Sequence, residues 1–355
     1  MRFLNNLVRT LVLLVLVAAV GFLGWLTAVE YMPDPVEEAT RTSAADAAQR
    51  NLKRGEELTV LNWNIGYAGL GKEADFFMDG GSQSKPADQS TVHRYLDGIA
   101  RTIAANAPDL VLLQEVDADS SRTYRIDERQ FLNSGMSSTA YALNYSCAFV
   151  PIPWPPIGRV NSGLYTMTAG LTIDEAERIA LPCPFSWPMR IANLKRCLLV
   201  SRLPVEGSDR ELVLVNLHLE AYDDGAGKIA QTRQLRAYLQ DEYEKGNYVI
   251  AGGDFNQVFP GSLDRYPNTH PKEWEPGVLD EALLPAGWTL AYDLTAPSCR
   301  LLNQPYDPGD TVGTQYYVID GLILSPNVEM KAVQTLDMGF EFSDHNPVRL
   351  SFALR

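Results

Sequence analysis

The chain has 355 residues, of which 46% are hydrophobic and 21% are charged, so it can bury a large core and is not intrinsically disordered. Its length suits one large domain or two ordinary ones. The 44 acidic and 30 basic residues give a net charge of −14, which repels nucleic acid at long range and argues against, without excluding, a nucleic-acid partner.

The first thirty residues differ in composition from the rest of the chain. Residues 11–29 carry no charge, and at ~1.5 Å per residue a helix of this length nearly spans the ~30 Å hydrocarbon layer. Arg2 and Arg9 precede this stretch and acidic residues follow it, which predicts a single-pass protein of the cell membrane with an extracytoplasmic domain. Residues 1–30 are therefore interpreted as an uncleaved signal anchor, and a cleaved signal peptide is the alternative.

Residues 31–56 are rich in Ala, Thr, Glu and Arg without an apolar stripe, and are expected to form a stalk. Residues 57–355 have the pattern of one continuous domain. Nine β-type runs occur in it, at residues 58–65, 109–116, 141–149, 162–167, 196–203, 211–219, 247–253, 316–324 and 346–354.

Amphipathic helical patterns lie between some of these runs. One covers residues 91–107, and the other covers residues 228–245, where Ile229, Leu235 and Leu239 are expected to face the core. Nine strands need two packed sheets, and the two helices would cover their outer faces. The predicted fold is a four-layer α/β/β/α sandwich, preceded by a transmembrane helix.

Four cysteines, Cys147, Cys183, Cys197 and Cys299, all follow the anchor. An even number of exported cysteines permits disulfides, in three connectivities. Four thiols packed as small hydrophobic groups are an equal alternative.

Two apolar segments pair Trp with Pro. Residues 147–163 read CAFVPIPWPPIGRVNSG and residues 181–190 read LPCPFSWPMR. Because Pro cannot donate to a β-ladder, both are expected to be loops. Trp154 and Trp187 then either pack as part of a rigid lid over the sandwich or form an apolar rim that enters the bilayer interface.

Polar side chains stand at the ends of six predicted strands. Taken singly they have simpler explanations, such as a turn for Gly-Gly-Asp-Phe-Asn or a hydrogen-bonded core position for His218. Together they predict one cluster of carboxylates, amides and imidazoles, made of Asn62, Asn64, Gln114, Glu115, Asn216, His218, Asp254, Asn256, Asp320, Asp344 and His345.

Seven sequence elements around these residues resemble those of the endonuclease/exonuclease/phosphatase superfamily of metal-dependent phosphoesterases. In order they are LNWNIGY, LVLLQEV, VNSGLYT, LVNLHLEAY, VIAGGDFNQ, YVIDGLILS and FSDHNPV, and they span about residues 57–355. The superfamily has the four-layer sandwich that the strand and helix pattern also predicts.

The resemblance implies a catalytic role for five residues. Asp254 and Asn256 match the pair that orients the attacking water and contacts the phosphate. His345 resembles the catalytic histidine, Asp320 resembles its partner carboxylate, and His218 resembles the second histidine of the subset that uses two. Which group is the base and which the acid stays open.

The resemblance also implies a divalent metal site. Glu115 resembles the metal-binding carboxylate, with Asn64 beside it and Asp344 as a further ligand or supporting group. Hard oxygen ligands suit Mg²⁺ or Mn²⁺ better than Zn²⁺. Substrate binding is assigned to Asn161, Trp154 and Trp187.

The substrate class rests on differences from individual subfamilies. The Trp-Cys-Asp-Arg run of inositol phosphatases is absent around Asp320, and abasic-site nucleases lack the histidine that His218 supplies. Sphingomyelinase-type enzymes share two histidines and work at membranes, so a phospholipid or lipid-linked phosphodiester is the expected substrate. An extracellular nuclease or a small-phosphoester phosphatase is the alternative, and a non-catalytic binding protein is a distant one. Nothing predicts the oligomeric state.

Residues 66–84 form an acidic, glycine-rich stretch directly after the first element. Glu73, Asp75 and Asp79 either bind a cationic head group or belong to a solvated loop.

Overall fold

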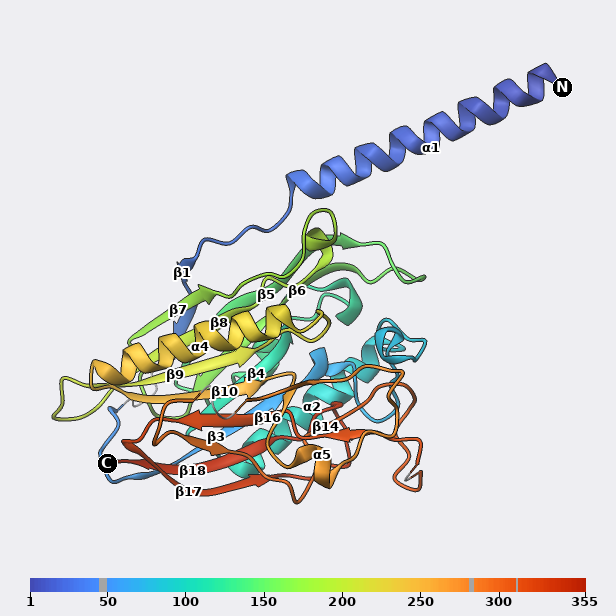
Figure 1. Ribbon diagram of the computed structural model, residues 1–355. Helices are drawn as coiled ribbons and strands as arrows, with labels where there is room; N and C mark the ends of the chain where they lie inside the picture. Colours follow the sequence, from blue (N-terminus) through green and yellow to red (C-terminus); the bar gives the residue numbers. More distant parts are fainter. Residues whose placement is uncertain (45–49, 281–283, 311) are drawn as a thin grey trace.

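The computed structural model describes residues 1–44, 50–280, 284–310 and 312–355. Two mixed sheets pack face to face and helices cover their outer faces, which confirms the predicted α/β/β/α sandwich (Figure 1). Helix α1 (Arg2–Ala28) is the first element of the chain and projects away from the sandwich.

The first sheet contains seven strands, in the order β17-β18-β3-β4-β6-β5-β2. Strands β3 and β4 are parallel, and the other neighbours are antiparallel. The strands are β17 (Val328–Thr335), β18 (Val348–Leu354), β3 (Glu57–Asn64), β4 (Leu110–Asp117), β6 (Gly158–Thr168), β5 (Ser138–Val150) and β2 (Thr40–Ser43).

The second sheet also has seven strands, in the order β1-β7-β8-β9-β10-β16-β13. Its one parallel pair is β9–β10. The strands are β1 (Val36–Glu38), β7 (Glu175–Ala180), β8 (Cys197–Pro204), β9 (Glu211–His218), β10 (Tyr248–Asp254), β16 (Asp320–Leu324) and β13 (Thr289–Ala291).

Each parallel pair is joined by a helix, because parallel neighbours need a crossover. Helix α2 (Gln89–Asn106) connects β3 to β4, and its apolar side packs on the outer face of the first sheet. Helix α4 (Ala226–Glu244) connects β9 to β10 and covers the second sheet through Leu235 and Leu239. Ile229 was expected to face in, but it is 48% exposed. At 3.6 residues per turn, it points about 100° away from the direction that Leu235 and Leu239 share.

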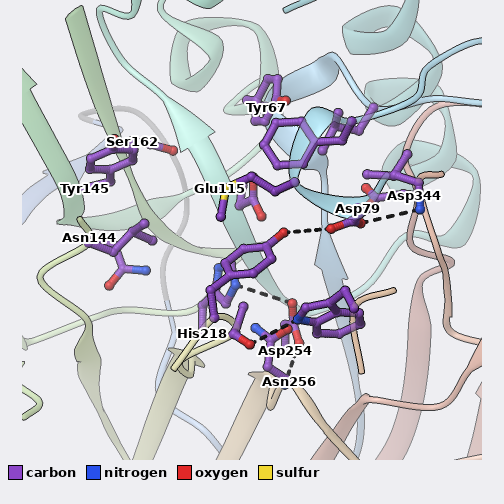
Figure 2. Close-up of a pocket in the computed structure, with 18 of the residues that line it drawn as sticks. Tyr67, Asp79, Glu115, Asn144, Tyr145, Ser162, His218, Asp254, Asn256 and Asp344 are labelled. Atoms are coloured by element: carbon purple, nitrogen blue, oxygen red, sulfur yellow. Dashed lines mark hydrogen bonds and ion pairs between the residues drawn. The ribbon is translucent and has the colours of Figure 1, made fainter. Parts of the chain in front are cut away.

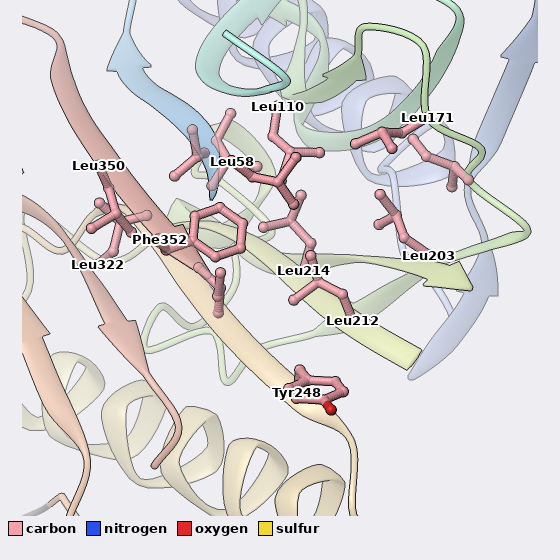
Figure 3. Close-up of a cluster of buried hydrophobic side chains, with 14 of the residues drawn as sticks. Leu58, Leu110, Leu171, Leu203, Leu212, Leu214, Tyr248, Leu322, Leu350 and Phe352 are labelled. Atoms are coloured by element: carbon pink, nitrogen blue, oxygen red, sulfur yellow. The ribbon is translucent and has the colours of Figure 1, made fainter. Parts of the chain in front are cut away.

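The core between the sheets is built of alternating inward side chains. Leu58, Leu110, Leu212 and Leu350 come from four different strands and are fully buried in one cluster (Figure 3). At ~25 cal/mol per Å² of apolar area, this burial is the main force holding the two sheets together. The nine predicted β-type runs all become strands of this sandwich or of its rim, where residues 316–324 divide into β15 and β16.

Short elements complete the rim. They are the strand pairs β11 (Gln257–Val258) with β12 (Gly277–Val278) and β14 (Cys299–Arg300) with β15 (Tyr316–Tyr317), the helices α3 (Glu128–Leu132) and α5 (Ser262–Arg265), and the single turns η1 (Gly66–Ala68), η2 (Phe77–Asp79), η3 (Ser121–Thr123) and η4 (Met189–Ala192).

The segment predicted to be a stalk takes part in both sheets instead. Strand β1 pairs with β7, and strand β2 pairs with β5. An edge strand needs backbone hydrogen bonds on one side only, so residues 36–43 join the sheets without an apolar stripe that would reveal them. The missed strands β7 and β17 likewise lie at or next to sheet edges.

The four cysteines are free thiols, so the disulfide alternative is wrong for this structure. Cys147, Cys197 and Cys299 are buried, and Cys183 is partly exposed. They pack as small hydrophobic groups.

Candidate active site

The polar strand ends converge on one cavity of about 170 Å³, far more than the ~10–15 Å³ that one water needs. It lies where β4, β9 and β10 end, and Figure 2 shows Glu115, His218, Asp254 and Asn256 pointing toward a shared space. Of the eight residues predicted for catalysis and metal binding, six line this cavity, namely Glu115, His218, Asp254, Asn256, Asp344 and His345.

Asn64 and Asp320 lie directly behind that lining. The Asn64 amide donates to Oε1 of Glu115 at 3.2 Å and to Oδ2 of Asp254 at 3.0 Å, so it ties two strand ends together. Its own oxygen accepts from the backbone N–H of Gly66 at 3.0 Å. The structure therefore gives Asn64 a bridging position between the carboxylates.

His345 is held by a buried carboxylate. Its Nδ1 lies 2.8 Å from Oδ2 of Asp320, which also accepts a hydrogen bond from the Ser298 hydroxyl at 2.7 Å. This arrangement directs Nε2 of His345 toward the cavity, where it lies 3.8 Å from Oδ2 of both Asp254 and Asp344. Burial by itself lowers the pKa of His345, but the Asp320 carboxylate outweighs it and the pKa lies well above the usual value.

His218 has the opposite electrostatic environment. Its Nε2 is 3.4 Å from Oδ2 of Asp254, yet burial and the charge of Arg196 hold its pKa well below the usual value. The two imidazoles thus flank one carboxylate with opposite preferred protonation states. Such a pair supplies both an acid and a base near neutral pH.

Asp254 lies between the two histidines at the end of β10. Its Oδ1 accepts from the Asn256 backbone N–H at 2.8 Å, which fixes the carboxylate plane. Burial raises the pKa of Asp254 to about 7, against the lowering effect of the His345 charge. Asn256 adopts φ +48°, a strained conformation for a residue with a side chain, and its amide donates to Leu219 O at 2.9 Å.

Glu115 is placed by an irregularity in β4. The pairing of β4 with β6 shifts register between Leu113 and Val116, and Glu115 has φ +56°. A bulge re-aims a side chain, so Glu115 faces the cavity at the end of an otherwise regular strand. The local strain, ~1–3 kcal/mol for a non-glycine residue, is typical of functional positions.

The oxygen-rich side of the cavity fits a hard divalent cation. Burial raises the pKa of Asp344 to about 6, and the negative charge of the nearby Glu115 carboxylate adds to this rise. In the described part of the chain, two groups of three side chains bring possible metal-ligand atoms within 4.8 Å of one another. Both contain His345, which is joined by Cys299 and Asp344 in one group and by Asp254 and Asp320 in the other. Carboxylate and amide oxygens match Mg²⁺ or Mn²⁺.

A family model described as "Endonuclease/Exonuclease/phosphatase family" matches residues 61–345. The chain belongs to this family. Its members' chemistry, together with the assembled carboxylates, amides and imidazoles, makes the protein a metal-dependent phosphoric ester hydrolase and confirms the predicted enzyme class.

Solved structures with the same fold are distant in sequence. A family protein from Beutenbergia cavernae has a TM-score of 0.56 and 19% identity, and the match covers 84% of this chain and 72% of that one. The human Nocturnin catalytic domain with bound sulfate scores 0.52 at 18% identity over 89% and 97% of the two chains. ANGEL2, a 2′,3′-cyclic phosphatase in complex with adenosine-2′,3′-vanadate, scores 0.53 at 16% identity over 90% and 99%. No curated protein matches the sequence.

Three of the polar strand residues, Asn62, Gln114 and Asn216, do not line the cavity and instead form hydrogen bonds between strands. The Gln114 amide donates to Asn62 at 3.0 Å and to Asn216 at 2.7 Å, and the Asn62 amide donates to Gly253 O at 3.2 Å. All three amides are fully buried between the sheets. They join the strands that carry Glu115, His218 and Asp254.

The predicted substrate-binding residues are not part of the cavity wall. The Asn161 side chain lies beside Ser146 at 2.8 Å, on the face of β6 opposite to Ser162, which does line the cavity. Trp154 is 90% exposed and Trp187 is 51% exposed, so the packed-lid alternative is wrong for both. The loop that carries Trp154 is shorter than the predicted residues 147–163, because strand β5 continues to Val150 and strand β6 begins at Gly158.

The structure connects Asp79 with Tyr222 at the cavity and adds Trp274, Asn144 and Arg196, which the sequence analysis did not select. Asp79 accepts a hydrogen bond from the Tyr222 hydroxyl at 3.0 Å, and Trp274 lies next to Tyr222 with ring centroids 6.3 Å apart. Asn144 and Arg196 also line the cavity. Trp274, Asn144 and Arg196 lie outside the seven elements, so no local pattern connects them with the site.

The acidic stretch at residues 66–84 is divided by the fold. Glu73 forms an ion pair with Arg94, and Asp75 accepts hydrogen bonds from Ser82 and Gln83. Only Asp79 of the three reaches the cavity, and it is 6% exposed. The interpretation as a wholly solvated loop is therefore wrong, and any contact with a head group is limited to Asp79.

Proposed function

We propose that the protein is a membrane-anchored phosphodiesterase that hydrolyses a phospholipid or lipid-linked phosphodiester, using Mg²⁺ or Mn²⁺. The main support is the composition of the cavity, whose lining combines the proposed catalytic cluster with several apolar side chains. The apolar side chains include Phe77, Met78, Ile157 and Leu194.

The proposed reaction gives a role to each of these side chains, and their positions support it. Asp254, with its pKa near neutrality, is placed to accept the proton of an attacking water, and Asn256 is placed to orient that water and the phosphate. His345, held protonated by Asp320, is placed to donate a hydrogen bond to charge that develops on phosphoryl oxygens. His218 supplies a neutral imidazole on the other side of Asp254.

Glu115 and Asp344 would hold the divalent cation, with Asn64 supporting Glu115. When bound there, the cation supplies positive charge opposite the non-bridging oxygens and the leaving oxygen. The protein residues supply the remaining binding and proton transfer.

Anchoring is proposed through helix α1, which is long and apolar enough to cross a membrane, with a mean hydropathy of 2.5. Only 6% of the most apolar stretch of this helix is buried against the rest of the protein. The arginines before the span and the acidic residues after it favour an extracytoplasmic catalytic domain.

A nucleotide phosphoester is the second candidate substrate. ANGEL2, which shares the fold, is described as a 2′,3′-cyclic phosphatase in complex with an adenosine vanadate. The net charge of −14 and the apolar cavity wall favour the lipid over a polyanionic nucleic acid.

Two measurements on the full-length protein in detergent or proteoliposomes test the proposal. Hydrolysis of bis-p-nitrophenyl phosphate should require Mg²⁺ or Mn²⁺ and stop with EDTA. Mixed liposomes, plasmid DNA and adenosine 2′,3′-cyclic phosphate are then compared as substrates, with products identified by mass spectrometry. DNA nicking or cyclic-nucleotide hydrolysis without lipid cleavage would overturn the lipid proposal.

A further inference from the structure

The end of helix α1 is bound to the catalytic domain through a buried carboxylate. Oε1 of Glu30 lies 2.9 Å from Nε of Arg190 and 3.4 Å from Nζ of Lys195, and the Glu30 side chain is only 3% exposed. Because both basic residues belong to the segment after the second Trp-Pro pair, the contact joins the membrane end of the helix to that loop. A flexible tether would make no such contact.

Two contacts lie further back along the helix. Nε1 of Trp187 donates to Oγ1 of Thr27 at 3.1 Å. The ring of Phe149, next to the end of β5, packs edge-on against Phe22 with centroids 6.0 Å apart. Phe22 lies six residues before the end of α1 at Ala28, which is ~9 Å along the helix axis.

The Phe149 contact places the end of β5, directly before the hairpin tip, beside the apolar part of α1. Figure 1 shows the hairpin extending beneath the helix. If α1 crosses a bilayer, the chain that follows Phe149 lies level with the outer part of the hydrocarbon layer. The hairpin would thus enter the same leaflet as the end of the helix.

The side chains at the hairpin tip suit that position. Residues 151–157 read PIPWPPI and carry no charge. Ile152 is 68% exposed and Trp154 is 90% exposed, and Met189 in the neighbouring loop is 65% exposed. Trp is favoured at membrane interfaces, and an uncharged loop of this kind loses little on leaving water.

The hairpin loop and the loop that carries Met189 also form part of the cavity wall. Ile157 ends the hairpin loop and Ala192 ends η4, and both line the cavity. They pack in one small cluster with Phe77 and Val150. The position of the hairpin relative to the bilayer therefore sets where the cavity opens.

We propose that Glu30 docks helix α1 onto the catalytic domain and that this docking inserts the β5–β6 hairpin tip, residues 151–157, into the adjacent lipid leaflet. The cavity mouth then faces the bilayer surface. This inference rests on the proposed membrane anchoring. Glu30 acts as a positioning residue and Trp154 as a membrane contact.

Insertion is tested by fluorescence of the full-length protein in vesicles of phosphatidylcholine brominated near the start of its acyl chains. Trp154→Phe should remove part of the bromine-quenched emission. Trp288→Phe serves as the matched control, because Trp288 packs against Tyr243 on the far side of the second sheet and should leave the quenched emission unchanged. Equal quenching in wild type and Trp154→Phe would overturn the insertion.

Docking is tested with Glu30→Gln. The quenched emission assigned to Trp154 should fall, and the apparent KM on vesicle substrate should rise about fivefold, equivalent to about 1 kcal/mol. Turnover of soluble bis-p-nitrophenyl phosphate should not change. Asp34→Asn is the control, since it removes a nearby exposed carboxylate and should behave as wild type. Trp187→Phe, which loses the bond to Thr27, should shift quenching in the same direction as Glu30→Gln.

The quenching assay separates this inference from the proposed substrate. If wild type cleaves no lipid while Trp154 is still quenched in a Glu30-dependent way, the substrate proposal fails and the docking stands. If Glu30→Gln leaves Trp154 quenching at the wild-type level, the docking is overturned whatever the substrate.

Discussion

Nδ1 of His345 and Oδ2 of Asp320 lie 2.8 Å apart, joining a residue just before β18 in the first sheet to the first residue of β16 in the second. The imidazole that we propose as catalytic is thus oriented by a contact between the two layers of the sandwich. Its function depends on sheet-on-sheet packing as much as on its own strand.

Replacing the partner carboxylate should therefore disable the imidazole without unfolding the protein. Asp320→Asn is expected to lower kcat on bis-p-nitrophenyl phosphate by about 10²- to 10⁴-fold, because the neutral amide lacks the charge that raises the pKa of His345 and keeps its imidazole protonated. Ser298→Ala, which removes only the hydroxyl that supports Asp320, should give a smaller loss. Wild-type kcat in Asp320→Asn would show that His345 does not act through this pair.

Glu115→Gln should weaken the metal site. Loss of one charged oxygen is expected to raise the Mn²⁺ concentration needed for half-maximal activity by at least about tenfold. Titration of Mn²⁺ by electron paramagnetic resonance measures binding without turnover. Glu341→Gln, which removes a carboxylate from a surface ion pair with Lys72, is the control and should bind Mn²⁺ as wild type does.

Asp79 should contribute to head-group selection. Asp79→Asn removes the only carboxylate of the acidic stretch that reaches the cavity, so KM for vesicles with a cationic head group should rise about fivefold relative to uncharged analogues. Glu73→Gln alters the exposed pair with Arg94 and the hydrogen bond from the Tyr95 hydroxyl, both outside the cavity, and should not change this ratio. An unchanged ratio in Asp79→Asn would remove the head-group role.

Stability should depend on pH through Glu242 on helix α4. The carboxylate is 1% exposed and is held by Arg202 at 2.9 Å, with further hydrogen bonds from Lys245 and Asn247. Burial alone raises its pKa, but these partners outweigh burial and lower the pKa from 4.5 to about 2. Its stabilisation is therefore complete above pH 4.5 and lost as the pH falls toward about 2.

Glu242→Gln should accordingly be less stable than wild type by about 2 kcal/mol at pH 7, with the difference shrinking between pH 4.5 and pH 2. Urea unfolding in detergent at several pH values measures this. The exposed neighbour Glu244, replaced by Gln, should stay within about 0.5 kcal/mol of wild type at each pH. A Glu242→Gln difference that grows on acidification would contradict the assignment.

The sandwich and most of the polar cluster could be predicted from the sequence, because the signals involved are local. Runs of β-branched and other apolar residues mark the buried strands, and the amphipathic pattern of residues 91–107 marks α2. Residues such as Asp254 and Asn256 stand directly at the end of such a run, so their convergence follows from strands ending at the same edge.

The other features depend on contacts between residues that are distant in the sequence, so local patterns do not predict them. A one-residue alternation turns Asn161 away from the cavity that Ser162 lines, and a register shift aims Glu115 into it. Edge strands β1 and β2 gain their stability from partners more than ninety residues away, so their own residues carry little pattern. The docking of Glu30 on Arg190 also depends on a contact across 160 residues, which arises from packing and not from local sequence.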